Sequence, residues 1–208
     1  MRTATRIVKD ATAKLRLAYE AAAVHEPPET EYVDNIGGIE TNAVLYALDA
    51  ETGKPVWETR VSYVQNEQSL TIAPRIAKGK VIVGPAGGDR PTRGFFAAYD
   101  AETGKEAWRF YTVPGDPAKG FESDAMKKAA ATWEGNWWKL GGGGAVWDGI
   151  SYDPESELLY VGTGNAEPWP EALRTKDTSS GSDNLYVASI VAVNVRPGRP
   201  SAVNRALH

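Results

Sequence analysis

The segment DAETGKPVW, which begins at Asp49, returns almost unchanged as DAETGKEAW at Asp100. In both copies a segment of alternating hydrophobic pattern precedes the Asp, and a Trp opens an extended segment after it. The Thr-Gly pair suits a tight turn, because glycine adopts positive φ without strain and Asp and Thr side chains bond to nearby backbone groups. Each copy therefore predicts a β-hairpin.

The spacing of the two hairpins predicts the architecture. Repeats of roughly fifty residues are typical of β-propeller blades, which are four-stranded sheets stacked around an axis. A weaker third copy spans residues 189–195, with Asn194 in place of the Asp and without the Thr-Gly pair or the Trp. We expect Trp57 and Trp108 to occupy equivalent places on adjacent blades, each packed between sheets. Taken alone, these motifs hold blades together and carry no chemistry.

The composition agrees with a β-rich chain and excludes several classes of protein. Among 208 residues, 21 Gly and 13 Pro favour many turns over long helices. A net charge of -4 gives no basic face for nucleic acid, and the lack of cysteine excludes disulfides and thiolate metal sites. No apolar run reaches the ~20 residues of a membrane helix, and the N-terminus predicts no secretory signal.

Candidate site residues lie between the repeats. The connection GPAGGDRPTRG carries one acid, Asp89, and the sequence GTGNAEPW places Asn165 after a β-rich run. Four glycines at 141–144 lead to Trp147. Such a run is costly in chain entropy, so either the backbone passes close to something flat or large, or the segment is a plain flexible loop. The segment FESDAMKKAAATW has helical spacing.

In order and spacing, the chain resembles the quinoprotein alcohol dehydrogenases. The resemblance rests on the repeated DAETGKxxW, on TIAPRIAKGKVIVG, WWKLGGGGAVWD and YDPESELLYVGTGN, and on the PW that follows. It covers about residues 42–195. It implies an all-β fold, a partial eight-bladed propeller of about three to four blades with tryptophan-docking motifs, located in the periplasm. Residues 1–41 are left unassigned, with a short helical segment expected around DATAKLRLAYEAAAV, and residues 196–208 form a divergent tail.

The resemblance implies a site for pyrroloquinoline quinone (PQQ). Trp147 matches the Trp on which the quinone stacks, and Thr71 matches a Thr that binds a cofactor carboxylate. Gly87 and Gly88 match the connection that leads to the metal ligand. Ala145 stands where the family commonly has a Thr that bonds to the quinone, so this bond is lost here.

The resemblance also implies a site for Ca²⁺ or a lanthanide. Asp89 takes the place of the family's metal-binding Glu, one methylene shorter, and Asn165 matches the amide-oxygen ligand. Each residue alone also has an ordinary interpretation, Asp89 as a solvated turn residue and Asn165 as a turn former. We name no catalytic residue, because the family's base is an Asp of a later blade.

The implied activity is hydride transfer from a primary alcohol to PQQ, with Ca²⁺ as Lewis acid and cytochrome c or ubiquinone as electron acceptor. We expect this chain to be an incomplete and by itself inactive part of such an enzyme, whose missing blades could lie on another chain. The alternative is a non-enzymatic propeller of PQQ-like repeats that serves as a protein-binding scaffold. A scaffold has no reason to keep LGGGGAVWD and GTGN beside an acid after Gly-Gly, so these motifs favour the dehydrogenase.

Overall fold

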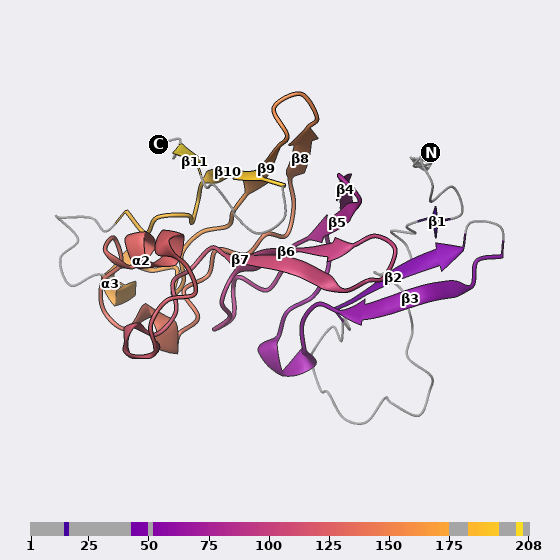
Figure 1. Ribbon diagram of the computed structural model, residues 1–208. Helices are drawn as coiled ribbons and strands as arrows, with labels where there is room; N and C mark the ends of the chain where they lie inside the picture. Colours follow the sequence, from indigo (N-terminus) through magenta and orange to yellow (C-terminus); the bar gives the residue numbers. More distant parts are fainter. Residues whose placement is uncertain (1–14, 17–42, 50–51, 175–182, 196–202, 206–208) are drawn as a thin grey trace.

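The computed structural model describes residues 15–16, 43–49, 52–174, 183–195 and 203–205. Their strands form three antiparallel sheets that follow one another along the chain (Figure 1). In each sheet, strands consecutive in sequence are neighbours in space, which is the meander of a propeller blade. The predicted partial β-propeller is therefore confirmed, with three blades among the described residues.

The strands have the following bounds. The first blade contains β1 (Leu15–Arg16), β2 (Val44–Asp49) and β3 (Pro55–Arg60). The second contains β4 (Arg75–Ala77), β5 (Lys80–Val83), β6 (Phe95–Asp100) and β7 (Glu106–Tyr111). The third contains β8 (Ile150–Asp153), β9 (Leu158–Gly162), β10 (Ile190–Asn194) and β11 (Val203–Arg205).

Short helices lie in the connections between strands. They are α2 (Asp124–Ala130), α3 (Glu171–Arg174) and the 3-10 turns η2 (Val64–Asn66), η3 (Pro117–Lys119) and η4 (Trp137–Lys139). Helix α2 forms where helical spacing was predicted, and the Ser123 hydroxyl caps it by accepting a 3.2 Å hydrogen bond from the Met126 backbone N–H. No helix in the described part of the chain is long and apolar enough to cross a membrane.

The two ends of the chain differ from the sequence-based expectation. Within the segment expected to be helical, the structure describes only Leu15–Arg16, and these two residues form strand β1 against β2, so the prediction of helix is wrong there. The rest of that segment lies outside the described residues. In the tail, β11 pairs with β10 and completes the third blade.

The repeated motifs form two equivalent hairpins. The carboxylate of Asp49 accepts hydrogen bonds of 2.9 Å from both the backbone N–H and the hydroxyl of Thr52. Asp100 accepts the same pair from Thr103 at 3.1 and 3.0 Å, and the turn glycines have φ of +70 and +69. Both strand pairs also shift register two residues before the Asp. The turn chemistry predicted from the sequence is therefore confirmed.

Trp57 joins the first blade to the turn of the second. Its indole N–H donates a 3.1 Å hydrogen bond to the carbonyl of Ala101, and its ring lies on Gly104, where an added Cβ would stand 2.6 Å from the indole. Thr59 donates a 2.6 Å bond to the Gly104 carbonyl. The prediction that Trp57 packs between blades is confirmed. Trp108, at the equivalent place in β7, packs against the core.

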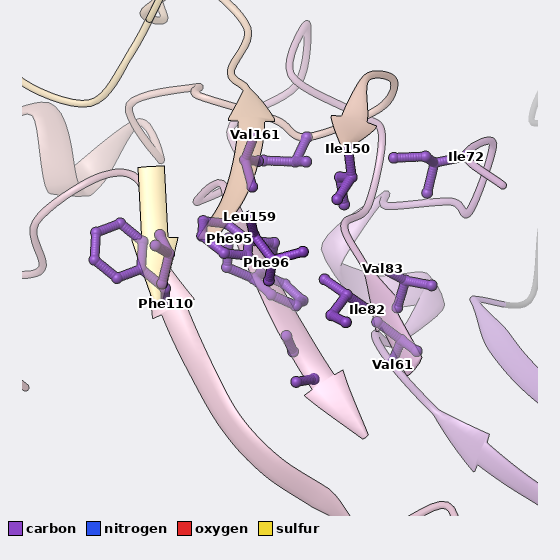
Figure 2. Packing of buried hydrophobic residues seen from close by; sticks show 14 of the residues in the cluster. Val61, Ile72, Ile82, Val83, Phe95, Phe96, Phe110, Ile150, Leu159 and Val161 are labelled. Carbon is purple, nitrogen blue, oxygen red and sulfur yellow. The ribbon is translucent and has the colours of Figure 1, made fainter. Parts of the chain in front are cut away.

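The core is continuous across the blades. Aromatic side chains from β6 and β7 pack with aliphatic side chains from β8 and β9, and Figure 2 shows Phe95, Phe96 and Phe110 beside Leu159 and Val161. A side-chain hydrogen bond also links β4 of the second blade to β8 of the third, since the guanidinium of Arg75 donates a 2.8 Å bond to the Ile150 carbonyl. The second and third blades are thus joined by a shared core and a hydrogen bond, and the loops at the ends of their strands are positioned relative to each other.

Candidate functional site

The four glycines at 141–144 form a ribbon between the loops of two blades. The carbonyl of Gly143 accepts a 2.8 Å hydrogen bond from the Gly94 N–H, just before β6. The N–H of Gly144 donates a 2.9 Å bond to the Asn165 carbonyl, just after β9. We call residues 141–144 the glycine ribbon. It fixes the loop that contains Asn165 against the loop that leads into β6.

The glycine ribbon cannot be built from other residues. All four glycines have positive φ, between +67° and +86°. A Cβ on Gly143 would lie 2.5 Å from the Asn165 carbonyl oxygen, and one on Gly144 would lie 2.6 Å from the Thr112 hydroxyl. The sequence left open a close approach to something flat or large and a plain flexible loop, and the structure shows a ribbon in close contact with its surroundings. What the ribbon approaches is the protein's own backbone and neighbouring side chains.

All seven sequence-predicted site residues line one pocket of about 330 Å³. They come from four loops: one before β4, one after β5, one before β8 and one after β9. The pocket thus lies where the end loops of the second and third blades meet. Ala86 and Gly164 complete a lining whose predicted members are Thr71, Gly87, Gly88, Asp89, Ala145, Trp147 and Asn165.

One wall of the pocket requires glycine. Gly87 has a φ of +111°, and a Cβ there would stand 2.6 Å from the Glu67 carbonyl oxygen. A Cβ on Gly88 would stand 3.1 Å from the methyl of Ala145. The paired glycines let the loop bearing Asp89 lie close to the Ala145 backbone. Ala145 itself is buried, with 2% of its surface exposed.

Trp147 is the large aromatic surface of the pocket. Its side chain is 56% exposed, whereas Trp133 and Trp137 are buried. Its carbonyl accepts a 3.1 Å hydrogen bond from the Thr71 hydroxyl, so this hydroxyl ties together the loops before β4 and before β8. Trp147 and Asn165 also border a neighbouring pocket of about 420 Å³. An exposed indole that borders two pockets offers an aromatic face on which a planar ring can stack.

The Asn165 side chain is held in place by hydrogen bonds that its amide nitrogen donates. Nδ2 donates hydrogen bonds to the Ala166 carbonyl at 3.1 Å and to the Glu167 carboxylate at 2.9 Å. Sequence reasoning missed Glu167. The available signal was an acid two residues after the Asn in GTGNAEPW, but nothing in the pattern shows toward which group that acid turns.

The acidic groups near the pocket limit the kind of metal site. In the described part of the chain no three His, Cys, Asp or Glu side chains gather closely enough to hold a metal ion. Asp89 is the one carboxylate residue among those lining the 330 Å³ pocket. A metal held here by Asp89 and Asn165 would therefore need further oxygen ligands from outside these two side chains.

A different pocket, of about 470 Å³, is lined by none of the predicted residues. It contains Arg93, which forms a bidentate ion pair with Glu122 at 2.6 and 3.0 Å and stacks 3.7 Å from the ring centroid of Tyr111. The Arg93 guanidinium lowers the pKa of the Glu122 carboxyl by hydrogen bonding. The charges of Arg93 and Glu122 are thus matched within the protein.

A protein-family model matches residues 60–203, and it describes the β-propeller domain of PQQ-dependent glucose, ethanol and alcohol dehydrogenases. Among curated proteins, the quinohemoprotein alcohol dehydrogenase ADH IIB of Pseudomonas putida is 53% identical over 156 residues. That match covers 74% of this chain and 22% of the relative. The chain thus spans about a fifth of the length of the curated relative it matches.

Two solved structures share the fold. The quinohemoprotein alcohol dehydrogenase of Comamonas testosteroni has a TM-score of 0.70 at 46% identity, covering 77% of this chain and 24% of that one. A europium-containing methanol dehydrogenase has a TM-score of 0.64 at 34% identity, covering 76% of this chain and 28% of that one.

Proposed function

The chain belongs to the family of PQQ-dependent glucose, ethanol and alcohol dehydrogenase β-propellers, and we propose that its pocket binds PQQ and a metal ion for the oxidation of a primary alcohol. The observation that carries the proposal is the common pocket: the seven residues that the family resemblance assigns to the cofactor and the metal line it together. Residues with only local turn roles would have no reason to meet there.

The pocket suits a flat, polar group. Trp147 exposes an indole face, and aromatic faces of this kind bind planar rings by offset stacking. Gly87 and Gly88 keep side chains out of the opposing loop. Thr71 lines the same pocket, and its hydroxyl would have to give up its hydrogen bond to the Trp147 carbonyl in order to donate to a carboxylate of the quinone. We propose that these residues hold the quinone and keep water from its face.

The metal would be held by two kinds of oxygen. The carboxylate of Asp89 and the amide oxygen of Asn165 are hard ligands of the type that Ca²⁺ takes at about 2.3–2.6 Å. A lanthanide has the same preference for oxygen, and the europium-containing relative supports this option. Because Asp89 is one methylene shorter than the family's Glu, its carboxylate would either reach the ion less well or draw the ion toward it.

When bound, PQQ would supply a hydride acceptor for the alcohol and the metal would supply Lewis acidity. The share of this chain is to orient the quinone on Trp147 and to fix the metal through Asp89 and Asn165. If Asp89 is a metal ligand, no carboxylate in the pocket is left to act as base. We therefore expect no alcohol oxidation by the 208 residues alone, because base catalysis accounts for roughly 10²–10⁴-fold in rate.

The activity, partners and location of a whole enzyme are proposals of the same kind. We propose that the electrons pass to cytochrome c or to ubiquinone and that the protein is periplasmic, both by family likeness. Fractionation of cells that produce the protein tests the location. The scaffold alternative gains no support from the pocket, since protein binding alone would not require these seven residues to converge.

Equilibrium dialysis tests the proposed site. The chain is dialysed against PQQ with and without Ca²⁺, and retained quinone is measured by absorbance. We expect retention by the wild-type chain that depends on Ca²⁺ and is lost in Asp89→Ala. Asp183→Ala, an exposed acid outside the pocket, serves as the matched control. Equal retention by Asp89→Ala and the wild type would contradict the proposal.

A further inference from the structure

The amide of Asn165 has both of its N–H groups engaged. Nδ2 lies 3.1 Å from the Ala166 carbonyl oxygen and 2.9 Å from a carboxylate oxygen of Glu167. Both neighbours can only accept hydrogen bonds at these atoms. The amide therefore turns its nitrogen toward them, because the reverse orientation would place three oxygens together. The choice between the two ends of the amide is fixed by chemistry.

The amide oxygen differs from the amide nitrogen in its hydrogen bonding. Oδ1 accepts no hydrogen bond from any described residue, whereas the backbone carbonyl of the same residue is bonded to Gly144. Asn165 lines the pocket that also contains Asp89. An amide oxygen without a hydrogen-bond donor, on a residue whose pocket is also lined by a carboxylate residue, is suited to a cation.

The backbone around this amide is already clamped. The carbonyl of Asn165 accepts a 2.9 Å bond from Gly144, and the N–H of Glu167 donates a 3.0 Å bond to the Gly142 carbonyl. The glycine ribbon thus fixes the main chain of residues 165–167. The remaining freedom lies in the side-chain torsions of Asn165, and a side-chain contact that restrains these torsions is the one to Glu167.

We propose that Glu167 is a positioning residue that locks the Asn165 amide with its oxygen toward the metal position. The proposal rests on the proposed function, since it concerns the same metal. Glu167 itself does not touch the metal. It acts through Asn165, in the way that outer partners of metal ligands generally fix the orientation of the ligand.

Terbium luminescence measures the effect on metal affinity. Tb³⁺ is added to the purified chain, tryptophan is excited, and the sensitised emission is titrated and then competed with Ca²⁺. We expect Glu167→Ala to weaken Tb³⁺ binding by about 10- to 100-fold, the usual loss when an outer partner of a metal ligand is removed. Glu155→Ala, on the exposed turn between β8 and β9, is the matched control and should bind as the wild type does.

The conservative variant separates positioning from charge. Gln at position 167 offers a carbonyl oxygen to the same Asn165 N–H but has no charge. We expect Glu167→Gln to restore Tb³⁺ affinity to within about threefold of the wild type, since only the orienting bond is needed. An equal loss in Glu167→Gln and Glu167→Ala would show that Glu167 acts as a charge or a direct ligand, and would overturn the proposal. So would wild-type affinity in Glu167→Ala.

A readout without metal keeps the two proposals apart. In the ¹H–¹⁵N spectrum of the metal-free chain, the Asn165 side-chain proton bonded to Glu167 should be shifted downfield from the range of free amides. This shift should vanish in Glu167→Ala and persist in Glu167→Gln. If the wild type binds no Tb³⁺, the proposed metal site fails, while this spectrum still decides whether Glu167 holds the amide. An Asn165 amide signal that is identical in the wild type and Glu167→Ala overturns the positioning role.

Discussion

Trp57 and Trp108 follow equivalent turns, but their indole N–H groups differ. The N–H of Trp57 donates to the Ala101 carbonyl at 3.1 Å. The N–H of Trp108 is buried and has no hydrogen-bond partner among the described residues. The residue equivalent to Ala101 in the third repeat is Val195, which follows Asn194, where the repeat departs from the Asp-Ala-Glu-Thr-Gly pattern. A buried donor without an acceptor costs about 1–3 kcal/mol.

Matched substitutions test this difference. Trp57→Phe and Trp108→Phe remove the same atoms, but the first breaks a hydrogen bond while the second removes an unpaired donor. We expect the free energy of unfolding to fall by about 1–3 kcal/mol more in Trp57→Phe than in Trp108→Phe. Denaturant unfolding measures both. A larger loss in Trp108→Phe would show that its indole N–H is bonded in solution.

The buried phenol of Tyr99 makes stability depend on alkaline pH. Burial raises the pKa of Tyr99 to about 12, whereas the unfolded chain ionises near pH 10. The native state therefore holds this proton more tightly, and its contribution to stability is complete below pH 10 and is lost as the pH rises toward 12. We expect a shallower alkaline loss of unfolding free energy in Tyr99→Phe than in the wild type. Tyr63→Phe, at an exposed position, should match the wild type.

At the scale of elements, the glycine ribbon joins two blades by backbone hydrogen bonds. Its positive φ values would strain any residue other than glycine. Gly144 and Gly149 both have positive φ, +67° and +79°. A Cβ on Gly144 would collide with Thr112 at 2.6 Å, whereas a Cβ on Gly149 meets nothing within 4 Å. A comparison of alanine substitutions at Gly149 and Gly144 therefore distinguishes the energy of backbone strain, present at both positions, from that of a steric clash, present only at Gly144.

We predict that Gly149→Ala costs about 1–2 kcal/mol, the strain of a left-handed residue with a Cβ. Gly144→Ala should cost clearly more, because the Thr112 hydroxyl that bonds to the Gly144 carbonyl at 2.6 Å must also move. Thermal and denaturant unfolding of the two variants provide the comparison. Equal losses would mean that the ribbon relaxes without disturbing Thr112.

Whether the sequence predicts an element depends on how far apart in sequence the residues that stabilise it lie. The Asp49 and Asp100 turns were predictable, because each is specified within a few residues by a Thr and a Gly. Helix α2 was predictable for the same reason. The partners of the glycine ribbon were not, since they lie in loops far away in sequence. The strand at Leu15–Arg16 was missed because its partner, β2, and not local propensity, decides its conformation.

At the scale of the whole molecule, the loops of the second and third blades form a pocket that neither blade contains alone. The order of motifs identified seven of its nine lining residues through the family resemblance, while their convergence required the fold. Glu167 could not be predicted, because its importance follows from the direction of the Asn165 amide. The central element of the proposed site is a quinone stacked on Trp147 beside a metal held by Asp89.

Fluorine NMR tests this claim most directly. The chain is labelled with 5-fluorotryptophan, which reports on all seven Trp residues, and Trp147→Phe identifies the resonance of Trp147. Addition of PQQ with Ca²⁺ is predicted to shift the Trp147 resonance strongly, to leave those of the buried Trp133 and Trp137 nearly unchanged, and to lose this effect in Asp89→Ala. A Trp147 resonance that does not move at saturating PQQ and Ca²⁺ would contradict the account.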